Sequence, residues 1–361
     1  MMPMRWSFLH PLERVRHTLA LLGGLWACSA AADTPVIRVG IIGLDTSHVV
    51  AFTDLLNRSD NADRVPGARV VAAYPQGSRD IESSVSRVAG YTAALENLGV
   101  EIVSSIDALI ERVDAVMLES NDGRVHLEQA APVLAAGKRL FIDKPMAASL
   151  ADAIAIFRIA AHHRTPVFSS SSLRFGPATQ AVRNGSIGVV LGCDTHAPLV
   201  IEPTHPDLFW YGIHGCEALF TAMGTGCQAV SRTKTAECDL VVGEWKEGRI
   251  GSFRGLRNGK KTYGGTAFGT QAVTAVGENA GYRPLVSEIV QFFQTGTPPV
   301  AEQETVELLA FMEAADESVR RGGTKVAVSD MIARAEGQAE PLVARHLSPS
   351  PAKPAATESP R

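Results

Sequence analysis

The sequence has little cysteine, few aromatic residues and no excess of charge of one sign. Among its 361 residues are 5 cysteines without a Cys-x-x-Cys pair, so the spacing predicts no zinc knuckle. We expect the four cysteines after Cys28 to be buried free thiols, although export would permit a disulfide. The formal net charge of −4 provides no basic surface, so we expect no nucleic-acid partner.

Long hydrophobic runs are also missing, apart from one near the N-terminus. Three arginines precede an apolar run over residues 19–32 that ends in Ala30-Ala31-Ala32. The run is shorter than the roughly 20 residues that span a bilayer. Residues 1–32 therefore have the pattern of a cleaved secretory signal, and we expect an exported protein, periplasmic or extracellular. Leu25-Trp26-Ala27-Cys28 resembles a bacterial lipobox, so lipid anchoring at Cys28 is the alternative, although Trp26 fits its small-residue position poorly.

Residues 33–168 alternate short β-branched runs with amphipathic stretches. This alternation predicts an α/β fold with a doubly wound parallel sheet, a Rossmann-type dinucleotide-binding domain. We expect strands at residues 37–42, 69–74, 100–104, 115–118, 140–142 and 166–168, and helices at 47–57, 81–98, 106–112, 126–136 and 149–161.

The second half of the chain has a different pattern. Residues 169–330 contain period-two runs separated by glycine-containing turns, which predicts an α+β domain with an open, mostly antiparallel sheet. Strands are expected at residues 188–193, 230–232, 238–245, 250–257 and 262–268, and helices at 177–184, 213–223, 286–295 and 305–320. Residues 331–361, which end in SPSPAKPAATESPR, are expected to be disordered.

The first predicted strand ends in an altered glycine loop, VGIIGLDTSH. Gly43 can make the tight turn of a dinucleotide-binding loop, but Asp45 and His48 occupy the positions of its second and third glycines. Two interpretations stay open. Asp45 could occupy the phosphate's position and cap the helix with Thr46 and Ser47, or Asp45 and His48 could face a ligand at the carboxyl end of the strand.

The end of the second strand lacks the acid that commonly binds ribose. Ser78 and Arg79 stand in that region and could hold a 2′-phosphate, which favours NADP over NAD. An ordinary turn with a solvated arginine is the alternative.

The stretch DAVMLESNDGRVHLEQAAPVLAAGKRLFIDKPMAASLADA resembles the Gfo/Idh/MocA oxidoreductases, relatives of glucose–fructose oxidoreductase and inositol dehydrogenase. The family pattern is a strand, a loop with Asn121, His126 before a helix, an Ala-Gly-Lys, a strand, and Asp143-Lys144-Pro145. The resemblance extends over about residues 37–328. It implies a Rossmann domain, a second domain whose open sheet often packs in homo-oligomers, and NAD(P)-dependent oxidation of a sugar, glycoside or cyclitol hydroxyl.

The resemblance also assigns roles. Lys144 matches the active-site lysine and Asp143 its acidic neighbour, and Pro145 would position the turn, plausibly through a cis bond. The cofactor would contact the loop after the first strand, the two residues expected at the 2′-phosphate, and the later family positions: Gly43, Asp45, Thr46, Ser47, His48, Ser78, Arg79, Asn121, His126, Lys144 and Pro145.

A second segment, FWYGIHGCEALFTAMG, resembles the family's other catalytic helix. His214 matches its histidine and Glu217 an acidic residue one turn later, whereas Trp210 stands where the family has an aspartate. Trp210 and its neighbour Tyr211 are candidates for contact with the substrate, because an aromatic face can stack on a pyranose. The segment resembles an exported subgroup of the family.

Three histidines and two carboxylates lie close together in sequence before and within this segment. They could form a metal site, but their spacing matches no standard motif, and we expect no metal. The residues are His196, Glu202, His205, Asp207 and His214.

Export and NAD(P) chemistry conflict, because free nucleotide is scarce outside the cytoplasm. The first hypothesis is therefore an enzyme that holds NAD(P) tightly and regenerates it within each cycle, with Lys144 and His214 as acid and base. The second is a protein that has lost dinucleotide binding: a carbohydrate-binding module, a lyase or a hydrolase.

Overall fold

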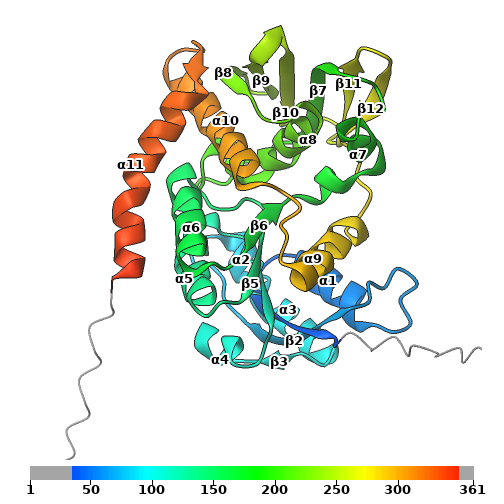
Figure 1. Ribbon diagram of the computed structural model, residues 1–361, viewed down its shortest axis with the longest axis vertical. Coiled ribbons are helices and arrows are strands. Elements are labelled where there is room, and N and C mark those ends of the chain that lie inside the picture. Colours follow the sequence, from blue (N-terminus) through cyan, green and yellow to red (C-terminus); the bar gives the residue numbers. More distant parts are fainter. Residues whose placement is uncertain (1–34, 349–361) are drawn as a thin grey trace, which may run out of the picture. The chain divides into compact units, whose positions relative to one another are not determined.

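The computed structural model describes residues 35–348, and the predicted signal segment and the end of the tail lie outside these residues. Two β-sheets follow each other along the chain (Figure 1). In the described part of the chain, no helix combines the length and the apolar character needed to cross a membrane.

The first sheet has six parallel strands in the order β3-β2-β1-β4-β5-β6. This is the predicted doubly wound arrangement, with the reversal of strand order between β1 and β4. The strands are β1 (Ile37–Ile42), β2 (Ala68–Tyr74), β3 (Glu101–Ile102), β4 (Ala115–Leu118), β5 (Arg139–Asp143) and β6 (Val167–Ser170).

Helices cover both faces of this sheet. Alternate residues of each strand point to opposite faces, and two hydrophobic clusters result. Leu118 and Ile142 belong to the cluster that includes α5 and α6, whereas Met117 and Phe141 belong to the one that includes α1 and α9. The helices of this half are α1 (His48–Asn57), α2 (Glu82–Val85), α3 (Val88–Asn97), α4 (Ile106–Ile110), α5 (His126–Ala135) and α6 (Leu150–His163).

The second sheet has seven strands in the order β12-β11-β7-β10-β9-β8-β13. It is mixed, because β7 and β10 pair in parallel while the other neighbours are antiparallel. The strands are β7 (Val190–Pro198), β8 (Cys227–Lys234), β9 (Cys238–Trp245), β10 (Ile250–Leu256), β11 (Gly264–Gly269), β12 (Val273–Val276) and β13 (Val326–Ala327).

One face of this sheet carries α8 (Ile213–Met223), and α7 (Pro177–Arg183) packs beside α8. Gly215 of α8 permits the close approach to the sheet, since a Cβ there would lie 2.2 Å from Cε2 of Phe253. The N-terminal turn of α8 faces the carboxyl ends of the first sheet's strands, because His214 in that turn lines the same cavity as Lys144, which follows β5.

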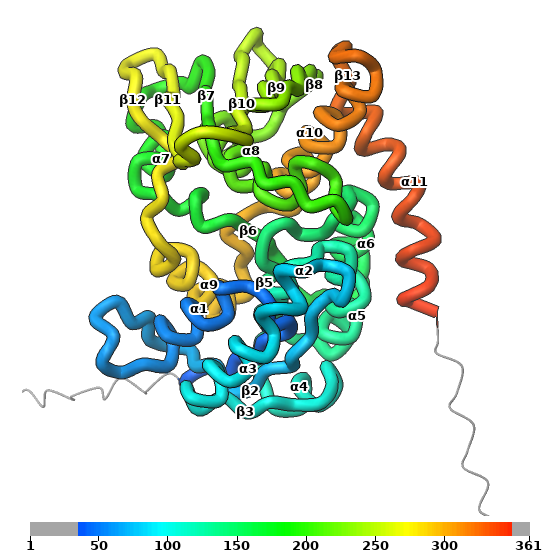
Figure 2. Tube along the Cα trace, turned by 180° about the vertical axis from the view of Figure 1, so that it is seen from behind, coloured from blue at the N-terminus to red at the C-terminus, as the bar shows by residue number. Residues whose placement is uncertain are grey.

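Three helices follow the second sheet: α9 (Arg283–Thr295), α10 (Glu302–Arg320) and α11 (Val328–Leu347). Helix α9 returns to the first sheet, so the first half of the sequence does not build its core alone. Figure 2 shows α11 running alongside α6.

The C-terminal residues up to Leu347 are helical, contrary to the predicted disorder. Met331, Ala335 and Ala339 recur at helical spacing and are buried in the core that includes α6. The expectation of a disordered segment from residue 331 was therefore wrong up to Leu347. A few apolar side chains at helical spacing suffice for packing against α6. Residues 349–361 lie outside the described part.

Most predicted elements are present with shifted ends. The single helix expected at residues 81–98 is two helices, α2 and α3, and the short strands β12 and β13 were not predicted. The four cysteines of the described chain are free thiols, of which Cys193, Cys216 and Cys227 are buried.

Candidate functional site

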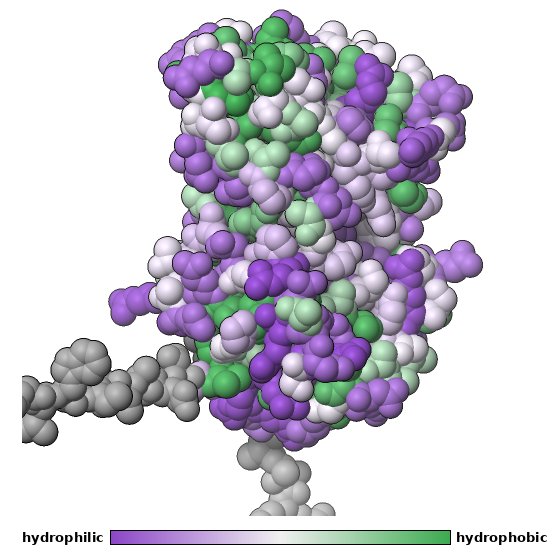
Figure 3. All heavy atoms as spheres, turned by 90° about the vertical axis from the view of Figure 1, so that its right-hand side faces the viewer, coloured by the Kyte–Doolittle hydropathy of each residue, from purple (hydrophilic) through white to green (hydrophobic). Residues whose placement is uncertain are grey.

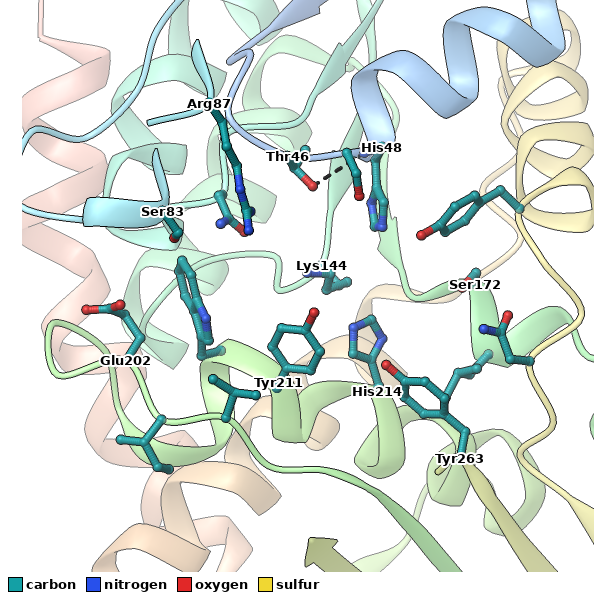
Figure 4. A pocket seen from close by; sticks show the side chains of 18 of the residues that line it. Thr46, His48, Ser83, Arg87, Lys144, Ser172, Glu202, Tyr211, His214 and Tyr263 are labelled. Atoms are coloured by element: carbon teal, nitrogen blue, oxygen red, sulfur yellow. Dashed lines mark hydrogen bonds between the residues drawn. The ribbon is translucent and has the colours of Figure 1, made fainter. Parts of the chain in front are cut away.

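A cavity of about 430 Å³ lies between the carboxyl ends of the first sheet and the elements around α8. Its size is within the range of small-molecule sites. Figure 4 shows His48 and His214 pointing into it from opposite sides, with Lys144 between them. The lining residues are Thr46, Ser47, His48, Ser83, Arg87, Tyr91, Asn121, Lys144, Ser172, Leu173, Val200, Ile201, Glu202, Trp210, Tyr211, His214, Tyr263, Asn279 and Tyr282.

The loop after β1 opens the N-terminus of α1 toward this cavity. Gly43 adopts φ 86°, and a Cβ there would lie 2.5 Å from the backbone N of Ser120, so only glycine fits. Asp45 is fully buried and does not cap α1: its carboxylate accepts the Ser84 hydroxyl at 2.6 Å and the Asn121 N–H at 2.8 Å. Ser47 is the N-cap residue and makes no side-chain cap bond.

The expected capping role of Asp45 is therefore wrong, because its carboxylate joins the loop to the segments after β2 and β4. Of the two residues that could face a ligand, His48 lines the cavity and the buried Asp45 does not. Burial raises the pKa of Asp45, while the bonds from Ser84 and Asn121 oppose that shift. Thr46, Ser47 and His48, at the N-terminus of α1, line the cavity, and a helix N-terminus favours an anion.

The end of β5 carries two titratable side chains in consecutive residues, Asp143 and Lys144. Asp143 points toward the α1 side, and its Oδ2 lies 2.9 Å from Nδ1 of His48. Burial by itself favours the neutral acid, but the charges of His48 and Lys144 outweigh it and lower the pKa of Asp143 to about 2. Lys144 is 8% exposed and lines the cavity, and the Lys144–Pro145 bond is cis, as predicted.

Helix α8 supplies His214, whose ring is held from behind. Nδ1 of His214 lies 2.7 Å from Oγ of Ser171, so Nε2 is the ring nitrogen available to the cavity. Glu217, one turn further along α8, accepts the Ser171 N–H at 2.7 Å and the Arg174 Nε–H at 2.8 Å. Burial, together with the positive charges of Lys144 and His48, lowers the pKa of His214 well below its ordinary value. His214 is therefore neutral at neutral pH and can accept a proton.

Aromatic side chains form much of the remaining wall. Trp210 and Tyr211 belong to a π-helical turn (Leu208–Gly212) that precedes α8, and both face the cavity. The Lys144 Nζ lies 5.9 Å from the Tyr211 ring centroid. Tyr263 and Tyr282 complete this wall, and the set suits the apolar face of a ring-shaped polyol.

Several residues expected at the cofactor do not line the cavity. Ser78 donates to Asp122 at 2.5 Å, and Arg79 is exposed, so neither is placed for a ligand in this cavity. His126 is fully buried, with its ring nitrogens 2.8 Å from the Ser120 carbonyl and 3.1 Å from that of Met146. It joins the loops after β4 and β5, and Pro145 is likewise buried in that region.

The segments after β2 and β4 are joined directly to each other. Besides the Ser78–Asp122 bond, Arg124 donates to both carboxylate oxygens of Asp80, at 2.9 and 2.8 Å. Oδ1 of Asp122 also lies 3.2 Å from Nε2 of His205, a contact that links the loop after β7 to these segments. The space between these two segments is thus filled by the chain's own polar side chains.

Sequence reasoning missed several cavity residues. Arg87 is the N-cap residue of α3 and Tyr91 lies within that helix, and Tyr263, Asn279 and Tyr282 come from segments near β11 and before α9. Nothing in their local sequence marks them. Tyr263 lies in the strand expected at residues 262–268, but that prediction did not place it at the cavity.

The residues weighed as a metal site are dispersed. His205 contacts Asp122, Asp207 is paired with Arg232 and Lys234, and His196 lies near Thr262. Within residues 35–348, no group of three histidine, cysteine or carboxylate side chains is placed to hold a metal ion.

Comparisons with known proteins agree with this architecture. Residues 37–170 match the Gfo/Idh/MocA family, described as an oxidoreductase family with an NAD-binding Rossmann fold. A sequence comparison with curated proteins found no match.

Solved structures share the fold at low sequence identity. Scyllo-inositol dehydrogenase from Lactobacillus casei, solved with NAD(H) and scyllo-inositol, has a TM-score of 0.65 at 15% identity, covering 82% of this chain and 100% of that one. Myo-inositol dehydrogenase from the same organism, in complex with NAD(H) and myo-inositol, has a TM-score of 0.65 at 17% identity over 81% and 97% of the two chains. GenD2 from gentamicin A biosynthesis, in complex with NAD, has a TM-score of 0.64 at 16% identity, with 81% and 96% covered. Residues 37–170 thus match the NAD-binding Rossmann fold of the Gfo/Idh/MocA oxidoreductase family, and the chain shares the fold of these solved dehydrogenases.

Proposed function

We propose that the protein is an NAD(P)-dependent oxidoreductase that acts on a hydroxyl of a sugar, glycoside or cyclitol. The observation that carries the proposal is the placement of Lys144 and His214 in one cavity onto which the N-terminus of α1 also opens. The first two groups suit proton transfer at a hydroxyl, and the helix N-terminus suits a phosphate.

The roles of the side chains follow from their charge and surroundings. The Lys144 Nζ makes no side-chain hydrogen bond among the described residues and lies 5.9 Å from the Tyr211 ring centroid, so its ammonium is free to donate to the oxygen of a bound hydroxyl and to stabilise negative charge there. His214 is neutral and held by Ser171, so it can take the hydroxyl proton through Nε2. Trp210 and Tyr211 would hold the ring of the polyol by stacking. The chemistry that a bound nicotinamide would supply is acceptance of a hydride from carbon.

The residues present fit part of a dinucleotide directly. Since Asp45 turns away, Thr46 and Ser47 at the N-terminus of α1 would meet a pyrophosphate in the cavity, and Asn121 and Lys144 line the same cavity. The cavity continues past Ser47 to Arg87 and Tyr91, and a groove between α1 and α3 shares these residues. We therefore propose Arg87 and Tyr91, rather than Ser78 and Arg79, as the side chains that would meet the adenosine end, with Arg87 favouring NADP.

A second candidate function rests on one observation. The Ser78–Asp122 and Arg124–Asp80 bonds fill the space between the segments after β2 and β4, beside which adenosine lies in doubly wound folds. This closure favours a carbohydrate-processing enzyme or binding protein that uses Lys144, His214 and His48 without a dinucleotide.

Nucleotide content separates the two candidates. The purified protein is denatured, and released nucleotide is identified by mass spectrometry, while a second sample is titrated with NAD and NADP. We expect retained or bound NAD(P) and turnover with a panel of sugars and inositols. A protein that releases no nucleotide and binds none at millimolar concentration would overturn the redox proposal in favour of the second candidate.

We further propose export and self-association. The predicted signal over residues 1–32 supports periplasmic or extracellular placement, and a tightly held cofactor would answer the scarcity of nucleotide there.

Exposed apolar side chains on the face of the second sheet opposite α8 support a homo-oligomer through that sheet. Ile250, Phe268 and Val273 are all exposed and stand in one row across it, because Ile250 and Phe268 both pair with Gly192 and Phe268 pairs with Val273. The face in Figure 3 shows hydrophobic side chains (green) among hydrophilic ones at the end that carries this sheet and also at the opposite end.

A further inference from the structure

Two carboxyl side chains stand next to each other at the ends of β4 and β5. Leu118 pairs with Ile142, so the next step in register brings Glu119 beside Asp143. Glu119 continues the ladder, since its N–H donates to the Ile42 carbonyl at 2.8 Å. Strand alternation turns both side chains away from the cluster of Leu118 and Ile142 and toward α1. Paired residues on neighbouring strands are about 5 Å apart, so the two carboxyl groups are close.

The pair is buried and incompletely hydrogen-bonded. Glu119 is 0% exposed, and neither of its carboxyl oxygens has a partner, while Oδ1 of Asp143 is buried and lacks a partner too. Two bare carboxylates side by side in an apolar interior would be very costly. One proton on Glu119 removes the repulsion and supplies a donor for Oδ1 of Asp143. Burial, reinforced by the charge of Asp143, accordingly raises the pKa of Glu119 well above its ordinary value.

The other oxygen of Asp143 holds His48, whose ring is fixed on further sides. The ring stacks on Phe52 at 5.3 Å, one turn along α1, and meets the edge of Tyr282 at 4.8 Å. Since Nδ1 is directed at Asp143, Nε2 is the ring nitrogen available to the cavity that His48 lines. The titratable groups around this ring are Asp143 and Lys144 from the end of β5, Tyr282 before α9, and His214 across the cavity.

We propose that Glu119, Asp143 and His48 form a hydrogen-bonded chain, in which a protonated Glu119 donates to Asp143 and Asp143 orients His48 as a second acid–base group of the cavity. The inference rests on the proposed function only in that its substrate would lie in the same cavity. His48 would serve the side of the substrate that faces α1, opposite His214.

The proton step is simple. A bond from hydrogen to a substrate atom that faces α1 breaks, the proton moves to Nε2 of His48, and the electron pair stays on the substrate atom. The imidazolium charge is then balanced by Asp143, which remains ionised, while Glu119 keeps its own proton. The reverse transfer returns the proton from Nε2.

Two measurements on the free protein test the chain without requiring turnover. The infrared difference spectrum between wild type and Glu119→Gln at pH 7 should contain the C=O stretch of a protonated carboxylic acid, and Glu96→Gln, at an exposed glutamate, should not produce it. ¹⁵N NMR of histidine-labelled protein, assigned with His48→Gln, should show that the neutral form of His48 carries its proton on Nδ1. Asp143→Asn should reduce that tautomer preference.

These outcomes test the Glu119–Asp143–His48 chain independently of the redox proposal. A missing acid band, or a neutral His48 with its proton on Nε2, would overturn the chain even if the protein oxidises polyols. Where turnover is found, His48→Gln should lower kcat by about 100-fold with KM little changed, the scale of a lost proton transfer. Glu119→Gln, which keeps a donor toward Asp143, should retain activity within about threefold. Equal loss in both variants would instead indicate a merely structural role.

Discussion

Oγ of Ser171 and Nδ1 of His214 lie 2.7 Å apart, so a residue at the end of the first sheet orients a histidine on α8. The same serine donates its backbone N–H to Glu217, which also receives the Arg174 guanidinium. The ring of His214, the base in the proposed reaction, is therefore held by contacts that join the two halves of the molecule.

Replacing Ser171 tests this orientation. Ser171→Ala removes the hydroxyl that fixes the His214 ring, and we expect kcat to fall by about 10-fold, less than the roughly 10²–10⁴-fold cost of losing proton transfer itself. Steady-state kinetics on the best polyol would measure the change. Ser172→Ala, at the next residue, is the matched control, and an equal fall in both variants would contradict the assignment.

Lys144 should control both turnover and the titration of His214. Lys144→Met removes the donor to the reacting oxygen, so we expect kcat/KM to fall by about 10²–10⁴-fold. The same change removes one of the positive charges that lower the pKa of His214, so that pKa should rise. An NMR titration of His214 in both proteins would detect it.

The sign of the pH effect on stability follows from the same shift. Because the folded-state pKa of His214 lies below its ordinary value, the unfolded chain binds the extra proton first, and this contribution to stability is lost as pH falls below about 6.5. His214→Gln should weaken that dependence in urea unfolding. An unchanged pH dependence, or an unchanged His214 titration in Lys144→Met, would contradict the electrostatic account. Lys260→Ala, at an exposed lysine, serves as the control.

Restoring a glycine at position 45 should cost stability without opening a site. Asp45→Gly removes a buried carboxylate with bonds to Ser84 and Asn121, so the free energy of unfolding should fall by about 3 kcal/mol. Nucleotide affinity should stay within about twofold, because the side chain points away from the cavity. Urea unfolding and calorimetric titration would give the two values. A tenfold gain in NAD affinity would mean that Asp45 does obstruct the phosphate.

The apolar row on the second sheet should control association. Ile250→Asp places a charge among exposed apolar side chains, so we expect an oligomer to dissociate while the fold and the cavity are kept. Sedimentation velocity would report the mass. Val36→Asp, at an exposed valine next to β1, is the control, and unaltered association of Ile250→Asp would place the interface elsewhere.

The sequence by itself determined the α/β architecture and the catalytic candidates at the strand ends. Hydrophobic period, turn residues and the Asp143-Lys144-Pro145 motif are local, and β1, β4 and α8 have the bounds expected from them. His48 could be singled out because the loop after a parallel strand lies at the binding crevice, whereas Lys144 and His214 were singled out by their resemblance to the family motifs. The α11 helix shows the limit, since its small buried residues resemble a disordered tail in composition.

Only the tertiary structure decided which way the side chains turn and which distant segments meet. The sequence placed Asp45 in the glycine loop, but Ser84 and Asn121, far along the chain, turned it away from the cavity. Arg87, Tyr263 and Tyr282 reach the cavity from segments without a local signal, and Glu119 became notable only when strand register set it beside Asp143. The physical reason is that hydrogen bonding and burial of polar groups depend on partners brought together by packing, which no local pattern encodes.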